Sequence, residues 1–456
     1  MYICVLQYDK MFFRKILNDL SEWAYDSDHK PLILRGARQV GKTTAIEMFA
    51  RQFTHSISFN LDRSADLKIF KEHDDVENLI PALFFTRQIP MNSGKTLIFI
   101  DEIQNSPKTV AMLRYFHEQF PQYYVVAAGS LLETLIDKHV AFPVGRVDFR
   151  IVRPVSFSEF LNASGQDQAI NALNTIPFPV YAHDQLLNLV RTYTFIGGMP
   201  AIVKKFVETR DLVTLQPLYD SLIASYLDDV EKYAPNDRFT RILRFVIRQS
   251  FYYAATRIKF EGFGKSTFSS RDIGDAFRLL EKALLLQLVY PSVESRQPII
   301  PDIRKSPKLQ LLDTGLVNFI TGLQENLFGS QLLSDIYEGR IAEHLTGQEL
   351  LALQSGALAH LNFWVREKRQ SQAEIDFLFS YKGMLIPVEV KSNTTGHLRS
   401  LHQFIDMAPH GYGVKIYSGI FKIEEAVTIT GKKFRLLNLP FYLIHKMEDY
   451  LGLLIS

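Results

Sequence analysis

The fold of the N-terminal part of the chain is decided by one stretch, Gly36-Ala37-Arg38-Gln39-Val40-Gly41-Lys42-Thr43-Thr44. It fits the phosphate-loop pattern G-x-x-x-x-G-K-[ST] and stands between a strand-like run, Leu32–Leu34, and a helical pattern, Thr43–Arg51. Glycines let backbone N–H groups close around phosphate oxygens, and a helix N-terminus favours their negative charge. We therefore predict that this loop binds ATP, with Lys42 at the β- and γ-phosphates and the Thr43 hydroxyl on Mg²⁺.

A second motif, the Walker B arrangement, supports this prediction. An apolar run, Leu97–Ile100, ends in the paired carboxylates of Asp101 and Glu102. We expect Asp101 to hold Mg²⁺ and Glu102 to polarise the attacking water, which predicts hydrolysis as well as binding.

Three further polar residues are candidates for sensing the γ-phosphate. Ser130 follows the strand-like run Tyr124–Ala128, where it acts either as a polar sensor or as a plain turn serine. Arg146 and Arg38 are each a candidate arginine finger, in cis or in trans, or a structural arginine. A finger in trans implies a homo-oligomer.

The composition is that of a multidomain globular protein, with 456 residues, 47% hydrophobic and 22% charged. The 51 basic and 49 acidic residues nearly cancel, so contact with nucleic acid must come from local patches. The single cysteine, Cys4, excludes an internal disulfide framework. No apolar run is long enough to span a membrane, and residues 1–10 lack the features of a secretory signal. We expect a cytoplasmic protein, with Met11 as an alternative translational start.

The apolar pattern divides the chain into three parts. From Pro31 to about Leu161, strand-like runs alternate with helical patterns, which is typical of a parallel α/β sheet. These runs are Leu32–Leu34, Ile57–Leu61, Thr96–Ile100, Tyr124–Ala128 and Val147–Val152. A helical region, Phe239–Tyr290, then ends in a strand-like run, Leu286–Pro291, which indicates a winged helix. A second α/β unit begins with the helical pattern Ile336–Leu353 and continues in the strand-like runs Phe363–Val365, Glu374–Ser380 and Met384–Lys391.

Several of these motifs together resemble a family of prokaryotic AAA-type ATPases. In that family, a C-terminal domain of unknown function related to restriction-type PD-(D/E)XK nucleases follows the ATPase. The resemblance runs from about Met11 to the end and is carried by Leu34–Thr43, Ile100–Gln104, Ala128–Ser130, Gly145-Arg146, Pro154–Leu161, Gly197–Pro200 and Leu312–Leu316. It implies an architecture more firmly than an activity.

Acidic residues in the last part of the chain form a second constellation. If the runs Glu374–Phe379 and Ile386–Lys391 pair as antiparallel strands, Asp376 and Glu389 meet, and Lys391 shares a face with Glu389. A nuclease of the PD-(D/E)XK type uses two such acids to hold Mg²⁺ and a lysine to orient the attacking water. Glu343, on the preceding helix, resembles the extra acid of such enzymes, and Gln403 is a further polar candidate. Three interpretations remain open: a cleavage-competent metal site, a relict nuclease fold, or ordinary strand-edge charges.

Basic residues of the winged-helix region are candidates for DNA contact. Arg271, Arg278 and Lys282 lie off the apolar stripe of a recognition-helix candidate. In the loop that follows, the phosphate-contact candidates are Arg304, Lys305 and Lys308. The alternative is a protein interface, for which ATPases also use winged helices.

The sequence thus predicts an α/β fold class: a P-loop NTPase sheet, a helical lid, a winged helix and a smaller α/β restriction-nuclease-like domain. The expected divisions are an N-terminal helix (1–30), the ATPase core (31–165), the lid (166–235), the winged helix (236–325) and the nuclease-like domain (326–456). The predicted function is an ATPase coupled to a Mg²⁺-dependent DNA nuclease. The alternative is a nucleotide-dependent switch whose last domain only binds DNA or a protein.

Overall fold

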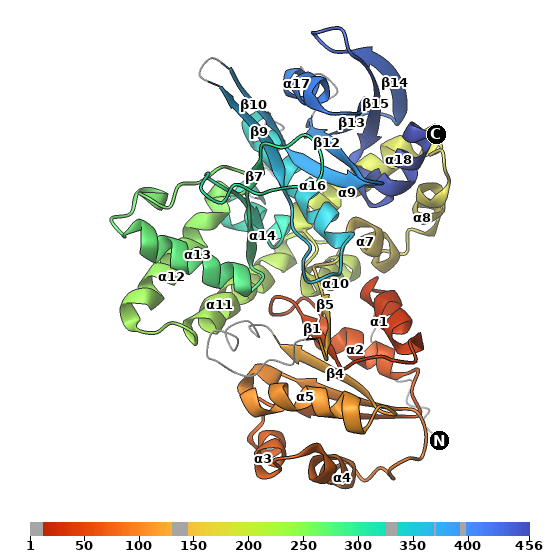
Figure 1. The fold of residues 1–456 in the computed structure, drawn as a ribbon, viewed down its shortest axis with the longest axis vertical. Coiled ribbons are helices and arrows are strands. Elements are labelled where there is room, and N and C mark those ends of the chain that lie inside the picture. Colours follow the sequence, from red (N-terminus) through yellow and green to blue (C-terminus); the bar gives the residue numbers. More distant parts are fainter. Residues whose placement is uncertain (1–11, 130–144, 325–334, 369–370, 393–397) are drawn as a thin grey trace.

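The structure, a computed structural model, describes residues 12–129, 145–324, 335–368, 371–392 and 398–456. Figure 1 shows the N-terminal sheet and the C-terminal sheet at opposite ends of the long axis, with helices between them. Within the described residues, no helix combines the length and the apolar character needed to cross a membrane.

The N-terminal sheet has five parallel strands in the order β2-β3-β4-β1-β5. Their bounds are β1 Leu32–Arg35, β2 His55–Asn60, β3 Thr96–Asp101, β4 Tyr124–Gly129 and β5 Asp148–Ile151. All five predicted strands are therefore confirmed, with ends that differ by one or two residues. The strand order, with β4 between the phosphate-loop strand β1 and the Walker B strand β3, is that of a P-loop NTPase sheet.

Helices cover both faces of this sheet, because successive strand side chains point to opposite faces. Leu32 and Leu34 of β1 pack in the same core as helices α1 (Ile16–Tyr25) and α2 (Lys42–Ala50). Ile33, between them, packs in a second core with three other helices. These are α3 (Ser64–Glu72), α4 (Val76–Thr86) and α5 (Pro107–Gln119).

The middle of the chain is mostly helical and joins the two sheets. Its first helices are α7 (Phe157–Ala163), α8 (Asp167–Asn174), α9 (His183–Ile196), α10 (Pro200–Thr209) and α11 (Gln216–Glu231). They are followed by α12 (Asp237–Ser250), α13 (Ser270–Lys282), the antiparallel strands β6 (Leu286–Val289) and β8 (Lys308–Leu311), and α14 (Thr314–Ile320).

The prediction of continuous helix from Phe239 was wrong between α12 and α13. Residues 251–269 form turns and short 3₁₀ segments instead. Gly262 and Gly264 have φ angles of 64° and 59°, in the left-handed region that breaks an α-helix.

The C-terminal sheet has five strands in the order β11-β12-β13-β15-β14. They are β11 Phe377–Tyr381, β12 Met384–Val390, β13 Tyr412–Tyr417, β14 Lys422–Val427 and β15 Lys433–Pro440, with the helices α16 (Asp335–Ala352), α17 (Arg399–Met407) and α18 (Met447–Ile455). A separate three-stranded sheet joins β7 (Pro291–Ser292), β9 (Phe363–Lys368) and β10 (Ser371–Ile375).

The expected single strand over Glu374–Ser380 was wrong, because the chain changes sheets at Asp376. Residues before it pair with β9, and residues after it pair with β12. The apolar alternation continues through both strands and so hides the break. At the break, the Asp376 carboxylate accepts a hydrogen bond of 2.8 Å from the backbone N–H of Val390.

Two glycine-containing motifs meet where α9, α10 and α14 converge. The buried carboxylate of Asp313 caps α14 at the N–H of Leu316 (3.1 Å) and accepts a second bond from the N–H of Gly198 (2.5 Å). Burial raises the pKa of Asp313 to about 6. A Cβ atom on Gly315 would lie 2.1 Å from the carbonyl oxygen of Ile196, so only glycine permits this approach.

We expect Gly315→Ala to destabilise the protein, by about 1–3 kcal/mol, because backbone must shift to make room. Thermal unfolding followed by circular dichroism measures the effect. Gly339→Ala is the matched control, since a Cβ there meets no atom of the described residues within 4 Å and alanine favours a helix. Equal melting temperatures for the two variants would contradict the prediction.

Candidate functional site: the phosphate loop and its connections

The phosphate loop joins β1 to α2 in the conformation that its glycines predict. Gly41, at the N-terminus of α2, has a φ of 94°, which disfavours any residue with a side chain. A Cβ there would also lie 3.0 Å from the Arg14 guanidinium. The loop is therefore held against the N-terminal segment.

Lys42 is turned into the loop. Its ammonium donates to the carbonyl oxygens of Gly36 (2.9 Å) and Ala37 (3.0 Å). Burial lowers the pKa of Lys42, and the nearby carboxylates of Glu102 and Asp101 partly offset this. The cation thus lies in the loop, within electrostatic reach of both Walker B acids.

The Walker B acids lie at the carboxyl end of β3, beside the loop. The Thr43 hydroxyl donates to the buried Asp101 carboxylate at 2.8 Å. Glu102 has a φ of 52°, an uncommon conformation for a residue with a side chain, and accepts from the Gln104 amide at 2.5 Å. Burial raises the pKa of Glu102 above its ordinary value, and repulsion from Asp101 adds to this.

Helix α11 lies over the outer side of the loop. Arg38 pairs with Asp229 of α11 at 3.0 Å, and Gln39 donates to Ser225 at 3.2 Å. The other arginine candidate, Arg146, is about half exposed and pairs with Glu118 at 3.5 Å. Ser130 lies outside the described residues.

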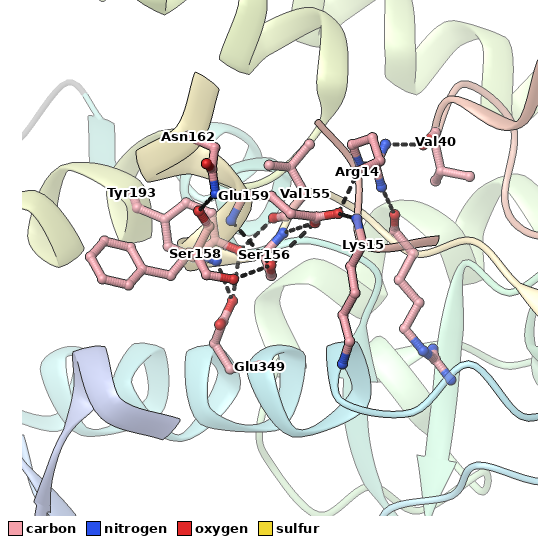
Figure 2. A network of polar contacts seen from close by, with 12 residues as sticks. Arg14, Lys15, Val40, Val155, Ser156, Ser158, Glu159, Asn162, Tyr193 and Glu349 are labelled. Atoms are coloured by element: carbon pink, nitrogen blue, oxygen red, sulfur yellow. Dashed lines mark hydrogen bonds and ion pairs between the residues drawn. The ribbon is translucent and has the colours of Figure 1, made fainter. Parts of the chain in front are cut away.

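A buried network ties the loop to the helices (Figure 2). Arg14 donates to the carbonyl oxygens of Val40 (3.0 Å) and Arg153 (2.6 Å) and to the Glu159 carboxylate (3.1 Å). Glu159 also accepts from the N–H groups of Lys15 (2.6 Å) and Ser156 (2.7 Å). With Ser156 it forms the capping box of α7.

The same helix end continues the network to α16 of the C-terminal part. The Glu349 carboxylate accepts from the backbone N–H of Phe157 at 3.0 Å and from the Tyr193 hydroxyl at 2.9 Å. Burial raises the pKa of Glu349 to about 7. A continuous set of contacts therefore runs from Val40 in the loop to α16 (Figure 2).

The structure brings Asp376, Glu389 and Lys391 together at the start of the C-terminal sheet. The Lys391 ammonium lies 2.7 Å from one Glu389 oxygen. The other Glu389 oxygen is buried, and no residue in the described ranges forms a hydrogen bond with it. Burial, and then repulsion from Asp376, raise the pKa of Glu389 to about 7. Gln403 lies 3.4 Å from Arg366, as an acceptor.

Lys308 also enters this acidic cluster, which corrects its predicted place in a phosphate-contacting loop. It begins β8 and is buried, with its ammonium 2.6 Å from Glu343, 2.7 Å from Glu374 and 3.6 Å from Asp376. Within the described ranges, no three Asp, Glu, His or Cys side chains are grouped so that they hold a metal ion. As arranged here, the predicted acids do not fit Mg²⁺.

Sequence reasoning missed several residues of these sites. Arg14 and Asp229 make their contacts with residues far away in the chain, and no local pattern marks them. The role of Glu159 could be predicted only in part. The S-x-x-E spacing from Ser156 predicts that Glu159 caps a helix, but it does not predict a buried arginine partner.

We expect Glu159→Ala to cost about 3–5 kcal/mol of stability, because it leaves the Arg14 guanidinium buried without its partner. Thermal unfolding is the measurement. Glu208→Ala removes an exposed carboxylate from α10 and should change little. A Glu159→Ala variant as stable as this control would contradict the prediction.

Comparison with known proteins agrees with the sheet and the loop. A family described as AAA domain matches residues 28–161, and two domains of unknown function, DUF8612 and DUF4143, match residues 187–327 and 338–441. No curated protein matches the chain.

Three similar solved structures are archaeal or bacterial. A Walker-type ATPase of Pyrococcus abyssi is 14% identical, with a TM-score of 0.44, over 69% of this chain and 97% of that one. Orc1 of Aeropyrum pernix, in complex with DNA, is 14% identical, with a TM-score of 0.29, over 71% and 95%. AMPPCP-bound DnaA of Aquifex aeolicus is 10% identical, with a TM-score of 0.28, over 59% and 86%. The family match, the strand order and the loop geometry agree on one conclusion: the N-terminal part of the chain is an AAA-type ATPase domain.

Proposed function

We propose that the chain hydrolyses Mg²⁺-ATP at the phosphate loop and uses the nucleotide state to control its C-terminal part. The observation that carries the proposal is the meeting of Thr43, Asp101 and Glu102 beside Lys42. A hydroxyl and a carboxylate 2.8 Å apart are hard oxygen ligands, so Thr43 and Asp101 fit one Mg²⁺. When bound, Mg²⁺ neutralises charge that develops on the phosphate oxygens.

The remaining roles follow from the side chains around the loop. Lys42 exchanges the carbonyl oxygens of the loop for the β- and γ-phosphates, whose negative charge adds to that of the Walker B acids in offsetting its burial. Glu102 takes the proton of the attacking water, and its raised pKa favours this role near neutral pH. The backbone N–H groups of the loop hold the phosphates, as its pattern predicts.

We infer that α11 reports whether the loop is occupied. Arg38 and Gln39 are loop residues, and both contact α11 directly. A change in the loop therefore alters the Arg38–Asp229 pair. The half-exposed Arg146 is the better candidate for a finger that reaches the nucleotide of a neighbouring copy.

Of the two outputs that the sequence leaves open, the arrangement favours the switch over the nuclease. Cleavage by the predicted mechanism needs acids that hold Mg²⁺, but Lys308 lies among these acids. The route for a switch is the network from Val40 through Arg14 and Glu159 to α16, because such packed polar contacts can carry coupling between sites.

A basic face on α12 supports DNA as the partner. Four exposed arginines recur at helical spacing on this face: Arg238, Arg241, Arg244 and Arg248. Arg238 pairs with Asp272 and Arg244 with Glu231, whereas Arg241 and Arg248 make no ion pair with any described residue. Arginines presented in this way suit phosphate oxygens, which are contacted without regard to sequence.

The helix that the sequence predicts for recognition, α13, lies beside this face. Its Arg278 pairs with Asp275 of the same helix, and Arg271 is exposed. We therefore propose that α12 supplies the main phosphate contacts and that α13 adds to them.

We expect Glu102→Gln to retain ATP binding but to lower the hydrolysis rate at least about 100-fold, because the proton acceptor is lost. Lys42→Ala should lose binding as well. Phosphate release and binding of a fluorescent ATP analogue separate the two effects. Hydrolysis at the wild-type rate in Glu102→Gln would exclude Glu102 as the base.

We expect Arg241→Glu with Arg248→Glu to weaken DNA binding at least about tenfold and to lower its salt dependence, by about one unit of slope for each phosphate that is no longer neutralised. Fluorescence anisotropy with a labelled duplex at several salt concentrations measures both. Arg51→Glu with Arg63→Glu makes the same charge change on the ATPase domain. If the two double variants bind DNA equally, the face belongs to another partner.

A further inference from the structure

The C-terminal acidic cluster already contains a cation of its own. The cluster consists of four carboxylates, from Glu343, Glu374, Asp376 and Glu389, and two lysines enter it, Lys308 and Lys391. Lys308 comes from β8, in the middle of the chain. Lys391 and the acids all come from α16 and the strands that follow it.

Lys308 is fixed in this position from several sides. Its side chain is only 7% exposed, its ammonium is close to three carboxylates, and it lies 4.9 Å from the ring centroid of Phe363. Burial alone would lower the pKa of Lys308, but Glu343, Asp376 and Glu374 outweigh this and raise it. The lysine is therefore charged and acts as a counter-ion to the acids.

The cluster nevertheless has more negative than positive charge. Four carboxylates face two ammonium groups and the Arg257 guanidinium, which lies 3.8 Å from Glu374, so the formal charge is −1. One oxygen of Glu389, a residue 6% exposed, is buried and has no hydrogen-bond partner among the described residues. The net negative charge and the buried Glu389 oxygen both point to a further cationic ligand, because the basic side chains of the cluster do not balance its acids.

Space beside Lys308 limits what can enter. A cavity of about 10 Å³ is lined by Lys308, Glu343, Phe377 and four neighbouring residues. This is about the room of one water molecule. A Mg²⁺ ion usually keeps several of its waters, so the hydrated ion does not fit while the ammonium is in place.

We propose that Lys308 is the resident cation of this cluster and that it keeps a divalent cation out. Once Lys308 leaves, Glu343, Asp376 and Glu389 form an oxygen-rich site for Mg²⁺ or Mn²⁺. The cluster is thus a latent metal site, closed by a side chain from the part of the chain that also presents the basic face. This inference does not depend on ATP hydrolysis.

The test is binding of Mn²⁺ to the nucleotide-free full chain, followed by electron paramagnetic resonance and calorimetry. We expect Lys308→Met to bind one Mn²⁺ at least about tenfold more tightly than the wild type. Addition of Asp376→Asn should abolish that gain. Lys308→Arg keeps the cation and should bind Mn²⁺ no better than the wild type. The phosphate loop is the same in all variants and cannot cause a difference.

Two controls keep the result interpretable. Lys259→Met removes one exposed positive charge from the same region and should leave Mn²⁺ binding unchanged. If Lys308→Met does not fold, Lys308→Met with Glu374→Gln restores the charge balance and retains the three proposed ligands. The proposal would be overturned if neither Lys308→Met nor Lys308→Met with Glu374→Gln binds Mn²⁺, or if the wild type binds it equally tightly.

Discussion

The Glu159 carboxylate satisfies donors from three places at once: the Arg14 guanidinium, the backbone of Lys15 and the backbone of Ser156, the N-cap residue of α7. Arg14 in turn holds the carbonyl oxygen of Val40 in the phosphate loop. The side chains of Arg14 and Glu159 are only 7% and 8% exposed, so water cannot replace a lost bond. The loop, the N-terminal segment and the start of the helical region are therefore fixed as one unit, and the contacts of α16 begin at the same helix end.

Local patterns were enough to predict the ATPase sheet and its loop. The strand-like runs and the glycines at Gly36 and Gly41 are features of neighbouring residues, and they specify strand, turn and helix without help from distant contacts. The pairings that complete the site are different in kind. Arg38 meets Asp229 across 191 positions of sequence, and Arg14 meets Glu159 across 145. A single sequence contains no periodic signal for such partners.

In the acidic cluster, too, local patterns predicted some residues, whereas contacts between distant parts of the chain placed others. The two-residue period of β12 placed Glu389 and Lys391 on one face, and the hairpin with β11 placed Asp376 near them. Lys308 could not be predicted in the same way. It follows Arg304 and Lys305 in a polar stretch, where a lysine normally faces solvent, and only the packing of β8 against α16 buries it. The places of Asp376 and Glu389 were thus local information, whereas the place of their counter-ion was not.

Asp376 lies at the point where the chain passes from one sheet into another. On one side, β10 belongs to a sheet that also contains β7, so this sheet combines the middle and the end of the chain. On the other side, β11 belongs to the C-terminal sheet. The two sheets nevertheless share one core, in which Trp364 and Ile375 of the first sheet pack with Leu378 and Leu385 of the second. Asp376 therefore marks a corner at which the chain turns from one wall of this core into the other.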